Sequence, residues 1–519
     1  MKKQSFIYGA LVLLIASIFN RAVGFAYQII VIRLIKPEGV GLFNMVYPVY
    51  VMVMVLSTMG IPLAISKLVA EEIASNNTRG AYRIFYICLI LLILSGTLFT
   101  LGLFFAAPLL VKYYFPNPKV YYSFLALIPG IFIVSLCSAF RGFFQGLQQM
   151  TPTAVTQVIE QLVRVTAGLT IAYFLLPRGV EYAAIGISLG VVCGEITGFL
   201  TMLFIYLRSR PLAPGFSGSF ETLGTSLQRI FSLGIPVTLT RFVSTALMSI
   251  DAVLIPHRLQ AGGLTLQQAT ALYGQFVGIA QTLLLTPGVI TAALATALIP
   301  AVSDALAQNN IKLVQSRTSE AIRLTNIAAF PCIVLFLFIP EELCRLLFGY
   351  QEAGQSLAIM ALGGLFLYFS QTTTGILQGM GEAIRPFKNL VIASSFKIAG
   401  IYFLTANADL GIKGTSMAIV LYCVIMAGLN YIDLKKLTGF RMYFVVSVIK
   451  PFFSAVLMGI TVWFVNNNMF AINNSPALST LTSIFLGISV YVLSLIIMGG
   501  VPPQDIARVK KFFQKALSR

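Results

Sequence analysis

Residues 6–33, FIYGALVLLIASIFNRAVGFAYQIIVIR, decide the fold class of this chain. The stretch is long enough to cross a membrane, because a helix needs ~20 mostly apolar residues to span ~30 Å of hydrocarbon. Asn20 and Arg21 nevertheless lie near its middle. An arginine at the centre of a spanning helix costs ~2.5–3.5 kcal/mol on insertion scales. We therefore expect Arg21 to face a polar cavity or a partner rather than lipid.

The composition extends this interpretation to the whole chain. Of 519 residues, 58% are hydrophobic and only 10% are charged, whereas soluble domains carry about 25% charged residues. These values predict an all-α polytopic membrane protein. The net charge of +18 does not indicate nucleic-acid binding, because the basic residues lie in short loops between apolar runs. Six scattered cysteines and a single histidine, His257, predict neither a disulfide framework nor a metal site.

The apolar runs predict about fourteen transmembrane spans. Their approximate bounds are 6–33, 42–69, 84–111, 121–146, 153–176, 183–207, 228–255, 271–302, 321–347, 355–380, 388–406, 412–434, 447–466 and 480–499. Most of the 35 Lys and Arg residues fall in loops on one side if the N-terminus is cytoplasmic. The positive-inside rule then places both termini in the cytoplasm. The first run lacks a small-x-small cleavage pattern, so we expect an uncleaved first transmembrane helix.

Few charges lie inside the predicted spans, and these are the candidate site residues. The basic ones are Arg21, Arg164, Arg241 and Lys397, and the acidic ones are Glu160, Glu195 and Asp251. Ionisable residues within membrane spans mark substrate or ion pathways by default.

Weak similarity between two halves predicts an internal duplication. Arg141-Gly-Phe-Phe-Gln-Gly146 resembles Gly375-Ile-Leu-Gln-Gly379, and Arg164 then matches Lys397. Gly60-Ile61-Pro62 matches Leu298-Ile299-Pro300, and Asn20-Arg21 matches Thr240-Arg241. Duplicated helical lobes with a site between them are typical of transporters. We expect a six-helix lobe over 1–207, a cytoplasmic linker over 208–227 and a second six-helix lobe over 228–440. Two additional helices and an amphipathic tail would follow over 441–519.

The charge pattern suggests an anionic substrate. Arg21 and Arg241, related by the repeat, would face each other across a central cavity, and guanidinium forks bind phosphate oxygens in pairs. Glu160 and Arg164 lie four residues apart. They form either an internal ion pair or a unit in which Glu160 orients Arg164 toward the substrate.

The other acidic residues leave alternatives open. Asp251 shares a helix face with Arg241 and is either an ion-coupling site or a counter-charge. Glu195, among small residues, is either an ion-coupling site or a hydrogen-bond partner of a neighbouring helix.

Two further features of the sequence are its last fifteen residues and the absence of common enzyme motifs. Residues 505–519 place Ile506, Val509, Phe512, Phe513 and Ala516 at helical spacing, which predicts an amphipathic helix on the inner leaflet, with a frayed basic tail as the alternative. The chain has no nucleotide-binding phosphate loop and no G-x-S-x-G or H-E-x-x-H motif. We therefore expect a protein that is not an enzyme and holds no cofactor. An H⁺ or Na⁺ ion or the membrane potential would supply the energy.

Several motifs resemble one known family. They are Asn20-Arg21-Ala-Val-Gly24-Phe25, Glu38-Gly-Val-Gly-Leu-Phe43, Gly60-Ile-Pro-Leu-Ala-Ile-Ser-Lys67, Arg141-Gly-Phe-Phe-Gln-Gly146, Met150-Thr-Pro-Thr-Ala154, Leu272-Tyr-Gly-Gln275 and Ala297-Leu-Ile-Pro-Ala-Val-Ser303. Together they resemble the flippases of the polysaccharide-exporter branch in the multidrug/oligosaccharidyl-lipid/polysaccharide exporter superfamily. The resemblance implies two six-helix lobes around a central cavity. It also implies transport of lipid-linked cell-wall precursor and a role in spore cortex formation.

The resemblance also implies part of the binding site. Related lipid II flippases use arginines of the first helix to bind the substrate diphosphate, and Arg21 is similar to one of them. A second family arginine has no match, because that region holds Tyr27 and Gln28. A family arginine of the eighth helix is replaced by a region that holds Gln275 and Gln281.

These departures lead us to expect Arg241 or Arg164 to supply the missing charge. The predicted substrate-binding set is Arg21, Arg241, Arg164, Lys397, Asn20 and Gln28. The predicted mechanism is alternating access, in which a polyprenyl-diphosphate saccharide crosses from the inner to the outer leaflet of the bilayer. The alternatives are an ion-coupled drug or metabolite antiporter and a membrane scaffold that recruits cell-wall synthesis enzymes. A membrane-embedded polymerase is disfavoured by the short outer loops.

Overall fold

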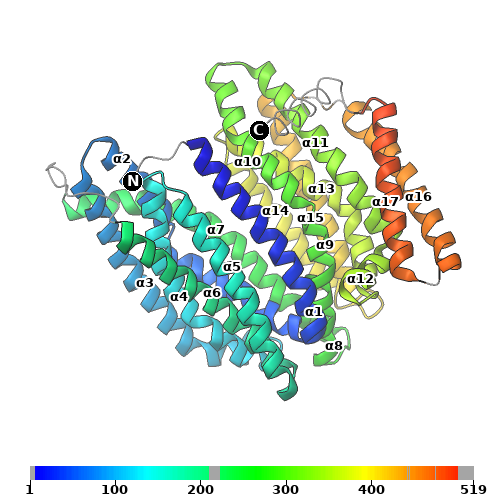
Figure 1. Ribbon diagram of the computed structural model, residues 1–519, viewed down its shortest axis with the longest axis horizontal. Helices are drawn as coiled ribbons and strands as arrows, with labels where there is room; N and C mark the ends of the chain where they lie inside the picture. Colours follow the sequence, from blue (N-terminus) through cyan, green and yellow to red (C-terminus); the bar gives the residue numbers. More distant parts are fainter. Residues whose placement is uncertain (1–5, 210–221, 441, 443–444, 474, 501–519) are drawn as a thin grey trace. The chain divides into compact units, whose positions relative to one another are not determined.

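A computed structural model describes residues 6–209, 222–440, 442, 445–473 and 475–500. All regular elements in these ranges are helical (Figure 1). The α-helices are α1 (Phe6–Thr58), α2 (Ile61–Ala74), α3 (Thr78–Tyr113), α4 (Tyr121–Gly146), α5 (Thr151–Leu175), α6 (Val180–Ser209), α7 (Leu223–Ala261), α8 (Leu266–Gln275), α9 (Thr282–Leu285), α10 (Gly288–Ala307), α11 (Ile311–Phe338), α12 (Pro340–Phe348), α13 (Ala353–Gly379), α14 (Ile384–Leu404), α15 (Ile412–Thr438), α16 (Lys450–Asn473) and α17 (Pro476–Ile497). Short 3₁₀ turns η1 (Pro118–Val120) and η2 (Leu176–Arg178) and π-helical segments η3 (Phe276–Gln281) and η4 (Val445–Ile449) connect them.

The first predicted span is the start of a much longer element. Helix α1 has 53 residues, which at ~1.5 Å per residue would be about 80 Å long, far more than a bilayer needs. It is broken at Lys36, whose φ of 60° and ψ of 166° are not helical and precede Pro37. Thirteen segments in the described ranges are long and apolar enough to cross a membrane, and the first, Leu11–Ala74, contains this break. Counted as two passes, it brings the total to the predicted fourteen.

Most predicted spans match a helix, and three are wrong in part. The span predicted over 42–69 is interrupted between Thr58 and Ile61, where α1 ends and α2 begins. The span predicted over 121–146 has the bounds of α4. The span predicted over 321–347 ends at Phe338, and a separate amphipathic helix, α12, follows it. The span predicted over 271–302 is interrupted, because η3 and Pro287 break it into α8, α9 and α10. The predicted amphipathic tail over 505–519 and most of the linker over 208–227 lie outside the described residues.

The chain forms two compact units, Met1–Gly278 and Ile279–Arg519. The first unit contains α1 to α8, so α7 and α8 pack with the preceding helices. The predicted lobe boundary at 208–227 lies earlier in the chain and stays a prediction.

The two units repeat one pattern of neighbouring helices. In the first unit α4 packs against α2, α3 and α6, and α5 packs against α6. In the second unit α13 packs against α10, α11 and α15, and α14 packs against α15. Helices α2 to α6 therefore correspond in order to α10, α11, α13, α14 and α15. This correspondence supports the duplication that the sequence predicts.

Paired glycines build the same close helix crossing in both units. Gly142 and Gly146 of α4 lie against α2, and Gly375 and Gly379 of α13 lie against α10. A Cβ atom at any of these four positions would come within 2.8 Å of a carbonyl oxygen on the facing helix. The small residues let the backbones approach closely, as is common where membrane helices associate.

The crossing also corrects one detail of the repeat. Gly146 faces the carbonyl of Ser66, and Gly379 faces the carbonyl of Ile299. Counting back four residues from each, Pro62 corresponds to Ala295. The predicted match of Pro62 with Pro300 is therefore out of register, because it rested on a short identity without a spatial constraint.

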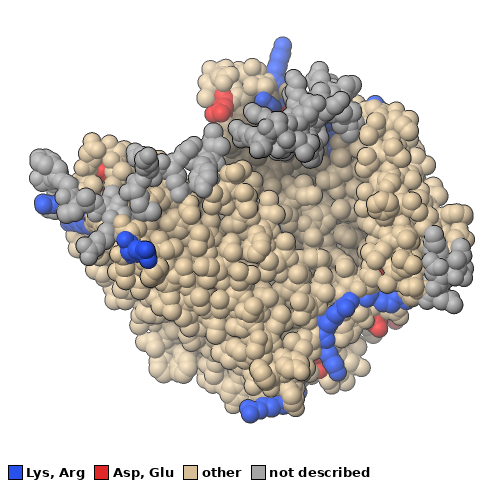
Figure 2. All heavy atoms as spheres, in the orientation of Figure 1, with Lys and Arg blue, Asp and Glu red and all other residues tan. Residues whose placement is uncertain are grey.

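The distribution of charge agrees with membrane insertion. Figure 2 shows a face that is almost free of charged side chains along the length of its helices, with lysines and arginines near the helix ends. Large apolar side chains such as Phe105, Phe174 and Ile497 are more than 70% exposed. Contiguous apolar surface of this kind marks contact with lipid.

Candidate functional site

The first unit contains a partly buried ion-pair triad made by α4 and α5. Glu160 of α5 accepts two charge-assisted hydrogen bonds of 2.7 Å, one at each carboxylate oxygen. Arg164, one turn further along α5, donates the bond to Oε1, and Arg141 of α4 donates the bond to Oε2. We call Arg141, Glu160 and Arg164 the arginine triad.

The local sequence explains why the arginine triad forms. Glu160 and Arg164 are four residues apart and therefore share one face of α5. Helix α6 lies directly behind this face, where a Cβ at Gly194 would come 2.7 Å from the Glu160 carbonyl oxygen. Gly198 lies similarly close to the Glu160 side chain. The two glycines let α6 pack tightly enough to hold Glu160 in place.

The arginine triad retains positive charge and unused donors. One carboxylate balances one of the two guanidinium groups, so the triad carries a net charge of +1. The three side chains are each about one-fifth exposed, Arg141 and Arg164 at 21% and Glu160 at 18%. The Nε atoms of both arginines have no hydrogen-bond partner among the described residues. The triad therefore leaves one positive charge that no carboxylate within it balances.

Arg21 lies on the helix next to the arginine triad. A Cβ at Gly24, one turn after Arg21, would lie 3.6 Å from the Gln161 side-chain nitrogen, next to Glu160. Helices α1 and α5 therefore run side by side at this level. The Arg21 side chain is exposed, and Asn20 is half-buried with its Oδ1 atom lacking a partner among the described residues. Helix packing thus places Asn20 and Arg21 on a helix that neighbours α5.

Glu195 belongs to the same region but not to the arginine triad. It is 4% exposed, and its Oε1 atom accepts a 2.7 Å hydrogen bond from the hydroxyl of Tyr50 on α1. The predicted alternative that Glu195 bonds to a neighbouring helix is confirmed. Its other oxygen, Oε2, has no partner among the described residues.

Three other predicted residues of the first unit lie elsewhere. The Gln28 amide donates to the carbonyl of Gly278 at 3.2 Å, which ties α1 to η3. Arg241 is exposed and Asp251 is half-buried, both on α7. The prediction that Arg21 and Arg241 face each other stays a prediction.

The second unit does not repeat the arginine triad. Lys397 of α14, the counterpart of Arg164, is 9% exposed, with its Nζ 5.4 Å from the centre of the Tyr422 ring. By the repeat register, Thr374 and Ala393 take the places of Arg141 and Glu160. The two units are therefore similar in packing and different in charge.

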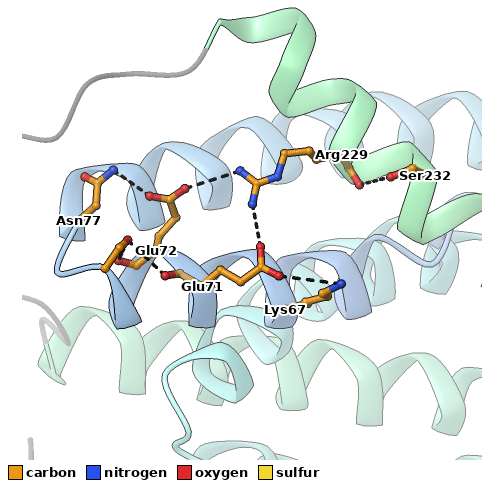
Figure 3. Close-up of polar contacts among 7 residues, drawn as sticks. Lys67, Glu71, Glu72, Asn77, Arg229 and Ser232 are labelled. Carbon is orange, nitrogen blue, oxygen red and sulfur yellow. Dashed lines mark hydrogen bonds and ion pairs between the residues drawn. The ribbon is translucent and has the colours of Figure 1, made fainter.

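A second polar network links α7 to α2 (Figure 3). The Arg229 guanidinium lies between Glu71 and Glu72, at nitrogen–oxygen distances of 2.7 and 3.8 Å. Lys67 lies 3.8 Å from Glu71, and the Asn77 amide donates to Glu72 at 2.7 Å. This network lies where α7 begins, after the residues that the sequence predicts to be a cytoplasmic linker.

Tight backbone contacts accompany the network. Gly60, with φ of 61°, precedes α2 and lies against the carbonyl of Gly234 in α7, so that no side chain fits between them. A similar contact joins Gly41 of α1 to the Thr270 carbonyl of α8. Gly41 in α1 and Gly60 before α2 thus contact α8 and α7, respectively.

Sequence reasoning missed two arginines of these sites. Arg141 counted among the cytoplasmic residues, but it lies inside α4 and bonds to Glu160. Arg229, at the start of the span predicted over 228–255, also counted among the cytoplasmic residues, but it bonds to two acidic residues of α2. The intervals from Arg141 to Glu160 and from Arg229 to Glu71 gave no local spacing signal. The six-residue repeat around Arg141 was the one available hint.

Comparison with known proteins now adds to this geometry. The sequence profile of the family described as polysaccharide biosynthesis protein matches residues 6–306. Stage V sporulation protein B of Bacillus subtilis (strain 168) is 31% identical over 466 residues, which cover 88% of this chain and 90% of that protein. The chain belongs to the polysaccharide biosynthesis protein family. The family expected from the sequence motifs is therefore confirmed.

Three further comparisons extend these similarities. Lipid II flippase MurJ of Bacillus subtilis (strain 168) is 24% identical over 468 residues, covering 83% of this chain and 84% of that protein. A solved structure of lipid II flippase MurJ in an inward closed conformation superposes with a TM-score of 0.71 at 16% identity, covering 94% of this chain and 99% of that one. This likeness shows the shared fold. The MatE profile matches residues 276–403.

Proposed function

We propose that this protein is a transporter that flips a lipid-linked saccharide from the inner to the outer leaflet of a bacterial cell membrane. The observation that carries the proposal is the arginine triad, which keeps a net positive charge and free N–H groups inside a membrane-spanning member of a polysaccharide biosynthesis family. The substrate is a polyprenyl-diphosphate saccharide used for cell wall or spore cortex. The protein performs no catalytic step, and cell-wall synthesis enzymes use its product.

The diphosphate explains the need for arginines. Guanidinium groups bind phosphate oxygens with two parallel hydrogen bonds and keep their charge at any physiological pH. Arg164 and Arg141 supply positive charge and are held in place by Glu160. Arg21 supplies positive charge from the neighbouring helix α1, where Asn20 supplies amide donors. Arg241 is the further candidate in the first unit.

Two more predicted contacts complete the proposed site. Lys397 is the candidate substrate-binding residue on the second unit. The Gln28 amide donates one N–H to the carbonyl of Gly278, and its second N–H would donate to the substrate.

Two close contacts, at Gly41 in α1 and at Gly60 just before α2, suggest how alternating access would work. The contact at Gly41 and the contact at Gly60 are separated by 19 residues, or about 28 Å of helix at ~1.5 Å per residue. This length is close to the ~30 Å thickness of the hydrocarbon core. In this proposal the Gly41 contact to α8 and the Gly60 contact to α7 lie near opposite faces of the membrane. Opening one contact while keeping the other gives access to one side.

The membrane potential suffices as an energy source. Moving one charge across 100 mV is worth ~2.3 kcal/mol. A diphosphate carries about two negative charges. When the cytoplasm is negative, moving it outward across 100 mV therefore releases about 4–5 kcal/mol of free energy. An ion gradient is the alternative, with Glu160, Asp251 and Glu195 as the coupling candidates.

One observation supports the drug-antiporter alternative. The MatE profile covers part of the second unit, and such an antiporter would need an acidic cavity to bind cationic drugs. The triad carries the opposite charge, which favours an anionic substrate. A passive scaffold would not need the arginine triad, because buried charges are costly to insert.

Reconstitution tests the proposal. Purified protein in vesicles with a fluorescent lipid-linked saccharide should move the headgroup across the bilayer, faster with an inside-negative potential. Arg21→Ala and Arg241→Ala should each abolish movement, whereas Arg178→Ala, an exposed arginine of η2, should leave it unchanged. Normal flipping by both site variants would refute the site assignment. Transport of cationic dyes with no headgroup movement would support the antiporter instead.

Fusion reporters test the membrane orientation. A reporter that is active only in the cytoplasm should be active at both termini. Activity at one terminus alone would contradict the even number of spans.

A further inference from the structure

Glu195 has a buried carboxyl group that takes no part in the proposed binding of the diphosphate by the arginine triad. Its side chain lies in the interior of the first unit and is 4% exposed. One oxygen, Oε1, accepts the Tyr50 hydroxyl at 2.7 Å. The other oxygen, Oε2, is buried and has no hydrogen-bond partner among the described residues. Buried polar atoms are nearly always paired, so an unpaired carboxyl oxygen requires an explanation.

The surroundings of Oε2 form a defined site. The backbone of Gly130 on α4 lies directly against Oε2, and a Cβ there would also come 2.6 Å from the Tyr50 hydroxyl oxygen. Any other residue at position 130 would displace the carboxyl group. Tyr50 itself is 1% exposed, so the hydrogen bond is sealed from solvent. Glycine and tyrosine therefore fix the carboxyl group in one position.

The charged and titratable groups around Glu195 come from every helix packed on α6. Helix α5 contributes Glu160 and Arg164, helix α4 contributes Arg141 and Cys137, and helix α1 contributes Tyr47 and Tyr50. Both arginines already donate to Glu160, and neither forms an ion pair with Glu195. A buried carboxylate without a cation in contact is unfavourable, whereas its protonated form carries no charge that needs compensation.

We propose that Glu195 is a proton-binding site, and that its proton sets the net charge of the site around the arginine triad. With Glu195 protonated, the triad and Glu195 together carry +1. With Glu195 ionised, the same four groups carry no net charge. The protonated state thus binds an anion more tightly, and by reciprocity the anion strengthens proton binding. This second part rests on the proposed function, whereas the proton site itself does not.

Infrared spectroscopy tests the proton site without any transport assay. The full-length protein in lipid nanodiscs should show the C=O stretching band of a protonated carboxyl group, which disappears as the pH is raised. The wild-type minus Glu195→Gln difference spectrum should contain this band. Tyr50→Phe should shift its frequency, because the carbonyl oxygen loses its hydrogen-bond donor. No difference band at any pH would overturn the proposal. Glutamine can still accept the Tyr50 hydroxyl, so the variant should fold.

Ligand binding tests the link to the triad. The probe is farnesyl diphosphate, a short isoprenoid diphosphate, titrated into the same nanodiscs. The wild-type Kd should rise at least about fivefold between mildly acidic and mildly alkaline pH, within the usual range of coupling between sites. The Kd of Glu195→Gln should stay at the acidic wild-type value, because its side chain is always neutral.

The two experiments fail separately. A pH-independent Kd in the wild type would overturn the link between Glu195 and the triad. The infrared band would still establish the proton site in that case. If the wild type does not bind the probe at any pH while the band is present, the anionic substrate class of the proposed function is overturned and the proton site stands.

Discussion

Glu160→Gln should be among the most destabilising single substitutions in the first unit. Glu160 accepts bonds of 2.7 Å from two arginines. With charge centres about 4 Å apart and an effective dielectric constant near 20, each attraction is about 4 kcal/mol before desolvation is subtracted. Removing one partner of a buried ion pair costs about 3–5 kcal/mol. Because the three side chains are about one-fifth exposed, we expect the lower end, about 3 kcal/mol.

Thermal unfolding in detergent at a fixed scan rate measures this effect. For a unit of this size, 1 kcal/mol corresponds to roughly 2 °C, so the midpoint should fall by roughly 6 °C. The control is Glu181→Gln, which removes a surface ion pair with Lys119 at 3.5 Å. This control should cost at most about 1 kcal/mol, because its partners are well exposed.

A double variant separates charge from packing. Glu160→Gln with Arg141→Gln removes the repulsion between two unpaired guanidinium groups. It should therefore be more stable than the sum of the two single effects predicts, as neighbouring residues in one network usually are. If Glu160→Gln unfolds at the same temperature as Glu181→Gln, or if the two single effects add, the arginine triad does not exist as described.

Three further predictions concern other parts of the fold. Gly142→Ala should lower the unfolding midpoint, because its Cβ would lie 2.6 Å from a carbonyl oxygen of α2. Gly102→Ala, with nothing within 4 Å of its Cβ, should not lower it, and equal midpoints would contradict the close crossing. Burial raises the pKa of the Cys344 thiol in α12, outside the candidate spans, to about 12. The thiol stays protonated at neutral pH, so mass spectrometry should find maleimide on Cys344 only after denaturation or at strongly alkaline pH, and rapid labelling of the folded protein would contradict this. Arg229→Ala removes half-exposed ion pairs and should cost less than about 1 kcal/mol in stability. It should nevertheless loosen α7 from α2 and increase maleimide labelling of a buried Ile230→Cys reporter, and unchanged labelling would show that Arg229 does not hold this contact.

Much of the fold could be predicted because its signal is local. Apolar runs of about 20 residues gave the number of spans, and the bounds of α4 were predicted without error. Errors arose where the backbone departs from a straight helix. The break at Lys36 depends on one unusual pair of dihedral angles. The end of α11 at Phe338 lies inside a continuous apolar run, so composition gave no warning.

The candidate site was predictable only in part. Glu160 and Arg164 share a helix face, so their pairing followed from the spacing of four residues. Arg141 is 19 residues from Glu160 and joins it only because α4 and α5 are brought together. Tyr50 and Glu195 are 145 residues apart, and no pattern in the chain connects them.

The sequence by itself determined that this protein crosses the membrane many times, that few charges lie within its spans, and that its two halves are related. These properties follow from hydrophobicity and local repetition, which each segment carries alone. Only the tertiary structure decided which charges meet. It joined Arg141 to Glu160, left one oxygen of Glu195 without a partner, and held α7 against α2 through Arg229. Contacts between residues far apart in the chain depend on how closely the helices approach, and glycines such as Gly130 and Gly194 set that distance.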